Sequence, residues 1–129
     1  MKKIIFAVII IGLIGYISIN NNSLNAGTTV GQCSYEISIA IGAGNCDTVG
    51  NCWYNIAKKI VGNPSCGSVA CTTCDVAQKI ASAELKNYKG LTVGNCSAAI
   101  ADHLGVTSGA WGTSVCNIAE KVSKTKTLK

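Results

Sequence analysis

Apolar residues recur every four positions in several short segments of the chain, and this spacing predicts helices. Two segments follow the pattern Cys-x-x-x-Ile-Ala-x-x-Ile/Leu, over 52–60 and 96–104. Residues four apart lie on one face of a helix, so each cysteine shares a face with the apolar residues that follow it. Two further segments follow Cys-x-Val/Ile-Ala-x-Lys-Ile/Val, over 74–80 and 116–122.

Residues next to these segments predict where the helices begin and end. Asn51 and Asn95 are suitable caps for the first pair of helices, and Gly62 and Gly105 are suitable ends. In the second pair, the apolar spacing predicts that the helix from Cys74 continues to about residue 89.

Opposite charges also stand four residues apart in the segment that begins at Cys74. Asp75 and Lys79 are placed to form an ion pair along this helix.

The two patterns alternate along the chain, which predicts a duplicated two-helix unit. Cys52 and Cys96 are 44 residues apart, and Cys74 and Cys116 are 42 residues apart. We therefore expect an all-α, disulfide-stapled bundle over 49–129. Its two units would be 49–92 and 93–129, preceded by an N-terminal segment, 27–48.

That N-terminal segment contains a conflict between two periods. Apolar residues alternate with other residues from Tyr35 to Ile41, as in a strand, yet Cys33 and Ile37 have the helical spacing. We favour a short helix, and keep a short strand as the alternative. A lone strand would need a partner, for example a second subunit in a surface filament.

The first 26 residues have the pattern of a secretory signal peptide. Lys2 and Lys3 precede an apolar run over 4–19, and a small residue, Ala26, is a suitable cleavage point. An uncleaved anchor is the alternative, although 16 residues are short for a bilayer span, which needs about 20. We expect a secreted, periplasmic or cell-surface protein.

Charge and composition exclude some partners. Removal of 1–26 leaves 103 residues with nine lysines and six acidic residues, a formal charge of +3. The chain has no arginine, the residue that most often contacts phosphates and bases in pairs of hydrogen bonds, so we expect no nucleic-acid partner. Exclusive use of lysine and the asparagines that follow the leader suggest a bacterial source.

Eight cysteines in an exported chain of this size predict four disulfides. Equivalent positions in a duplicated unit favour the pairs Cys52–Cys74 and Cys96–Cys116. Local bonds Cys33–Cys46 and Cys66–Cys71 would complete the set, with pairing across the two units as the main alternative. The first two bonds require the loops to return the chain to the starting end of the preceding helix.

Residues capable of catalysis or metal binding are few, and we expect no enzyme activity and no cofactor. Cys71 and Cys74 form a Cys-x-x-Cys motif, which suits thiol exchange or zinc binding, but six other cysteines favour a structural role. His103 is the only histidine and suits a helix end. Ser97 and Ser114 lack any motif that marks a nucleophile.

Candidate partner-binding residues are an aromatic residue and three lysines. Trp111 lies between glycines in an expected flexible loop, where it could anchor a partner or cover the core. The lysines are Lys58, Lys59 and Lys79. Of the neighbouring aromatics Trp53 and Tyr54, we expect one to pack inward and one to face outward.

These features predict an exported, non-catalytic protein that binds an unidentified protein or an anionic surface. In size and composition the chain resembles saposin-type proteins, which are small, lysine-bearing, disulfide-linked and helical. That resemblance implies membrane-active, lipid-binding behaviour as an alternative. The cysteine spacing departs from the six-cysteine order of that family, so the resemblance does not extend to membership.

Overall fold

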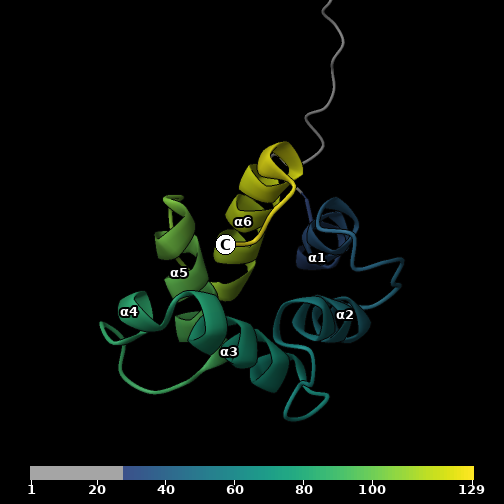
Figure 1. Ribbon diagram of the computed structural model, residues 1–129. Coiled ribbons are helices and arrows are strands. Elements are labelled where there is room, and N and C mark those ends of the chain that lie inside the picture. The colour runs from purple at the N-terminus through teal and green to yellow at the C-terminus, as the bar shows by residue number, and fades with distance from the viewer. Residues whose placement is uncertain (1–27) are drawn as a thin grey trace, which may run out of the picture.

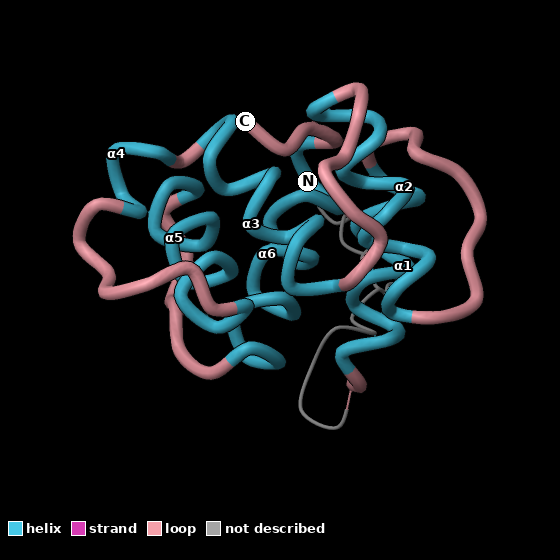
Figure 2. Tube along the Cα trace, turned by 90° about the horizontal axis from the view of Figure 1, so that it is seen from below, coloured by secondary structure: helices cyan, strands magenta, loops and turns pink. Residues whose placement is uncertain are grey.

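The computed structural model describes residues 28–129, a range that contains helices and no strand (Figure 2). The expected signal peptide lies outside the described residues. The helices are α1 (Val30–Ala40), α2 (Val49–Val61), α3 (Val69–Ile80), α4 (Ser82–Leu85), α5 (Val93–Leu104) and α6 (Trp111–Thr125).

Five of the helices pack as a closed ring. Each of α1, α2, α3, α5 and α6 contacts the next in that order, and α6 contacts α1. Figure 1 shows these helices around the C-terminal end of the chain, with the short α4 outside α5. The N-terminal segment thus contributes α1 to the same core as the rest of the chain.

Neighbouring helices in the ring run in the same direction. Cys33 and Cys116, near the starts of α1 and α6, are joined by a disulfide. Ile41 and Lys126, just beyond the ends of the same two helices, line one pocket. The starts of α3 and α5 are likewise joined, by Cys74–Cys96, and the ends of α2 and α3 line the same pocket. The loops therefore return the chain to the starting end of the preceding helix.

In three helices, the side chain of the seventh residue forms a hydrogen bond with the loop that precedes the helix. The seventh residue of α2, Asn55, donates to the carbonyl of Asn45 at 3.1 Å, ten residues earlier. Asn117 of α6 donates to the carbonyl of Thr107 at 2.8 Å in the same way. In α3 the carboxylate of Asp75 accepts from the backbone N–H of Ser65 at 2.7 Å.

The predicted ion pair between Asp75 and Lys79 is therefore wrong. The Ser65 hydroxyl also donates to the Asp75 carboxylate, at 2.8 Å. Within residues 28–129 no lysine pairs with a carboxylate, and the one contact of this kind joins Glu84 to His103, which carries a charge only when protonated. The loop contact replaces a pair that would gain little on an exposed helix surface.

All five long helices bury the same positions. Residues four, five, eight and nine of each helix are buried, a spacing that follows one face of a 3.6-residue period. Position eight supplies the largest shared part of the core: Ile37, Ile56, Val76, Ile100 and Ile118, all fully buried. Position nine is always alanine or serine, which allows neighbouring helices to approach closely.

The N-terminal caps of α2 and α5 lie three residues before the predicted ones. The side chains of Thr48 and Thr92 accept hydrogen bonds from the backbone N–H groups of Asn51 and Asn95, at 3.0 and 3.1 Å. The prediction that the two asparagines are caps is therefore wrong, because threonine oxygens satisfy the free N–H groups one turn earlier. The prediction that Gly105 ends a helix is confirmed, because this residue follows α5 and adopts a left-handed φ of 76°.

Helix α3 ends at Ile80, so the predicted continuous helix to residue 89 is also wrong. Ala81 is fully buried with φ −133° and ψ 34°, and the chain turns there before α4. This turn places Glu84 and Tyr88 against His103 and Asp102 of α5. Tertiary contacts with α5 override the helical propensity of the sequence.

Residues 33–40 form part of α1, so the alternative of a strand is excluded within the described chain. Cys33 and Ile37 are fully buried, whereas Tyr35 and Ile39 are 37% and 44% exposed. The apparent alternation arises because this helix carries apolar residues on two faces, each with its own four-residue spacing.

The disulfides confirm one of the four predicted pairs, Cys66–Cys71. The predicted pairs Cys52–Cys74, Cys96–Cys116 and Cys33–Cys46 are wrong. The bonds observed instead are Cys33–Cys116, Cys46–Cys52 and Cys74–Cys96.

The new pairs follow from the direction of each side chain around its helix. Cys74 and Cys116 are the sixth residues of α3 and α6, whereas Cys33 and Cys96 are the fourth residues of α1 and α5. Two residues along a helix rotate a side chain by about 200°, so positions four and six face different neighbours. Each sixth-position sulfur therefore meets a fourth-position sulfur on the next helix of the ring. Four disulfides indicate an oxidising, extracytoplasmic compartment.

Trp111 is the first residue of α6 and not part of a flexible loop, which corrects the prediction. Its ring is half-buried and lies 5.8 Å from the ring of Trp53. Trp53 is fully buried and donates to the hydroxyl of Ser34 at 3.1 Å. Tyr54 faces outward, so the expectation of one inward and one outward aromatic is confirmed.

Candidate functional site

The C-terminal ends of the helices surround a pocket of about 530 Å³. Its lining combines lysines with isoleucines and the last residues of the chain, and we call it the lysine pocket. The residues are Ile41, Lys59, Ile60, Lys79, Ile80, Lys126, Thr127, Leu128 and Lys129. Its volume lies within the usual range of small-ligand sites, about 300 to 1,000 Å³.

Helix geometry brings the apolar part of this lining together. Ile60 and Ile80 are the twelfth residues of α2 and α3, one turn beyond the buried position eight, and Ile41 follows the end of α1. The tail after α6 supplies Leu128, which is 1% exposed. The pocket floor is therefore the end of the hydrophobic core.

Charge around the pocket is positive. Four lysines line it and no acidic residue does. Four helices end there, and each helix end contributes about half a negative charge, about −2 in total. The α-carboxylate of Lys129 adds one more negative charge, so the four lysines exceed the negative charge by about one unit and the pocket attracts anions.

The predicted partner-binding residues are only partly brought together. Lys59 and Lys79 both line the lysine pocket, and Lys58 lines an adjacent hollow that shares Lys59. Trp111 lies at the opposite end of α6, a 15-residue helix that spans about 21 Å. The aromatic candidate and the lysine candidates thus do not form one surface.

Sequence reasoning missed Lys126, Leu128 and Lys129 because the tail has no periodicity after α6. The one sequence feature that could have indicated a buried position in the tail is Leu128, an apolar residue among lysines and threonines. Lys126 has a positive φ of 61°, which turns the tail back across the ring. Leu128 can then reach the core.

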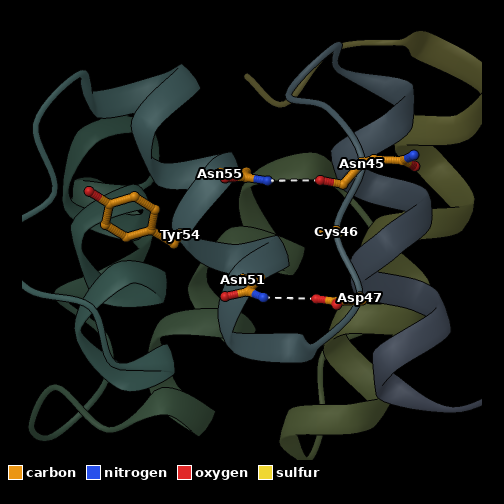
Figure 3. A pocket seen from close by; sticks show the side chains of 6 residues that line it. All are labelled: Asn45, Cys46, Asp47, Asn51, Tyr54 and Asn55. Atoms are coloured by element: carbon orange, nitrogen blue, oxygen red, sulfur yellow. Dashed lines mark hydrogen bonds between the residues drawn. The ribbon is translucent and has the colours of Figure 1, made fainter.

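A second pocket, polar and open, lies between α2 and the loop that precedes it (Figure 3). Asn51 donates to the carboxylate of Asp47 at 2.8 Å, and Asn55 donates to the carbonyl of Asn45. Figure 3 shows Tyr54 pointing away from these groups. The amides are already engaged in attaching the loop to α2, which favours a structural role.

A cluster of ionisable groups attaches α4 and the following loop to α5. His103 Nδ1 lies 3.2 Å from Glu84 Oε1, and the Tyr88 hydroxyl donates to the carboxylate of Asp102. This hydrogen bond raises the pKa of Tyr88 above its ordinary value of 10.0, and burial adds to the increase. The Ser97 and Ser114 hydroxyls both bond to nearby backbone groups, and neither meets the only histidine.

The Cys-x-x-Cys motif does not form a bond within itself. Cys71 pairs with Cys66, and Cys74 pairs with Cys96. Within the described chain no three histidine, cysteine or acidic side chains gather as a metal site. A search of the same residues finds no helix with the length and apolarity needed to cross a bilayer.

Comparison of the chain with protein-family models, curated proteins and solved structures finds no match.

Proposed function

We propose that the chain is an exported, non-catalytic protein that binds an anionic lipid surface through the lysine pocket. The observation that carries the proposal is a pocket lined by four lysines, with an apolar floor and no acidic residue. Anionic headgroups complement the lysines, and the floor suits the apolar region beneath the headgroups.

The unpaired state of the lysines supports this role. A lysine engaged by a neighbouring carboxylate would lose part of its attraction for an external anion. Among residues 28–129 no carboxylate forms an ion pair with a pocket lysine.

Export is supported by the four disulfides, which persist in oxidising compartments. A non-catalytic role is supported by the Ser97 and Ser114 hydroxyls, which bond to nearby backbone groups and not to His103. The filament alternative loses its support, because the segment Tyr35–Ile41 would have to leave α1 to act as a donated strand.

Vesicle flotation tests the proposal. The folded, oxidised protein is mixed with phosphatidylglycerol or phosphatidylcholine vesicles at low salt. A variant with Lys59, Lys79 and Lys126 replaced by Gln should bind phosphatidylglycerol about 100-fold more weakly, because each lysine near an anionic surface contributes about 1 kcal/mol.

A matched control removes the same charge from other places. It replaces Lys86, Lys89 and Lys121, which are exposed and outside the pocket, with Gln. This control should weaken binding by only a few-fold. Equal losses in the two variants, or equal binding to both lipids, would show that the pocket is not the binding site.

An acidic protein partner is the second candidate, and exposed Lys58 beside the pocket favours it, because it extends the positive surface beyond one small ligand. Pull-down from envelope or host proteins with the pocket variant as control tests this candidate. Specific capture without vesicle binding would favour it.

A further inference from the structure

The lysine pocket has two chemically distinct zones. Its floor consists of four branched apolar side chains: Ile41, Ile60, Ile80 and Leu128. Its charged zone consists of the exposed lysines Lys59, Lys79, Lys126 and Lys129. A purely electrostatic site for a flat surface would need the second zone alone.

Helix capping explains only part of this arrangement. Lys59 and Lys79 lie in or near the last turns of α2 and α3, where cations are favourable. Lys129 lies in the tail beyond the helices, and capping of helix ends gives no reason for a hollow with an apolar floor. The combination points to a ligand that is anionic at one end and apolar along its length.

We propose that the lysine pocket binds a single-chain anionic amphiphile, with a long-chain carboxylate as the representative ligand. The head group would contact the lysines, and the alkyl chain would lie on the half-buried Ile41, Ile60 and Ile80. This inference rests on the proposed function, because it uses the same lysines. It adds that one alkyl chain enters the pocket.

Calorimetric titration with acetate, octanoate and decanoate below their micelle concentrations tests the inference. Each buried methylene contributes about 0.8 kcal/mol. Decanoate has two more methylenes than octanoate, so it should bind about fifteenfold more tightly. Acetate should show no measurable binding. Replacement of Lys59 and Lys79 with Gln should weaken decanoate binding about tenfold while retaining the ratio between chain lengths.

A floor variant tests the apolar zone. Ile60→Thr should lower the ratio between decanoate and octanoate, whereas Ile39→Thr, on the exposed face of α1, should leave it unchanged. Near-ultraviolet circular dichroism, which reports the packing of Trp53 against Trp111, confirms that each variant is folded.

The outcomes separate this inference from the proposed function. Equal affinity for octanoate and decanoate would overturn the amphiphile site, even where the protein binds vesicles. Decanoate affinity that stays unchanged when Lys59 and Lys79 are replaced would also overturn it. Decanoate binding that follows the expected pattern without vesicle binding would support the site and overturn the proposed surface function.

Discussion

The disulfide Cys33–Cys116 closes the ring of helices, and its removal should cost far more stability than removal of a local bond. It joins residues 83 apart in sequence, whereas Cys66–Cys71 joins residues five apart. Loop-closure entropy predicts a loss of about 4.5 kcal/mol for the long loop and about 2 kcal/mol for the short one.

Burial adds to the difference. Cys33 is fully buried in the core and Cys66 is exposed, so truncation of Cys33 removes a further packing contribution of about 1 kcal/mol. The paired variants Cys33→Ala/Cys116→Ala and Cys66→Ala/Cys71→Ala should therefore differ by about 3.5 kcal/mol in the free energy of unfolding.

Urea unfolding followed by tryptophan fluorescence measures this difference, because Trp53 and Trp111 lie in contact near the starts of α2 and α6. Both variants keep three disulfides, so the comparison is balanced. A difference below about 1 kcal/mol would refute the argument that the long bond restrains the unfolded chain across the whole ring.

Two further predictions concern single side chains. The buried hydroxyl of Thr73 has no hydrogen-bond partner, so Thr73→Val should raise the free energy of unfolding by about 1 kcal/mol. In calorimetric melting, the neighbouring Thr72→Val should lower stability, because the Thr72 hydroxyl donates to the carbonyl of Ser68 at 3.0 Å. For Tyr88 the raised folded-state pKa means that its contribution to stability is fully present below about pH 10 and is lost as pH rises through the folded value. Ring-carbon NMR should show the Tyr88 pKa above that of exposed Tyr54 and lowered by Asp102→Asn; an unchanged value in that variant would contradict the assigned cause.

Local features of the fold could be read from the sequence with fair accuracy. The four-residue spacing around Ile56 and Ile100 identified buried helix faces, and Gly105 identified a helix end. Boundaries were less accurate, because Thr48 and Thr92 cap the helices one turn before the predicted asparagines. Caps depend on backbone geometry that several residue types can satisfy.

The candidate site was only half predictable. Lys59 and Lys79 were identified as exposed lysines on helices, but nothing in their spacing showed that they face one pocket. Lys126 and Leu128 were missed because their position depends on a turn of the tail across the ring.

The sequence by itself determined the helical class, the buried face of most helices and an oxidised state of the cysteines. These properties follow from periodicity and composition, which act within a few residues. Only the tertiary structure decided which cysteines pair and which lysines share a pocket. A helical period tells which face is buried but not which neighbour covers it, and here the return loops align the helices so that one end of the ring gathers both the lysines and the apolar floor.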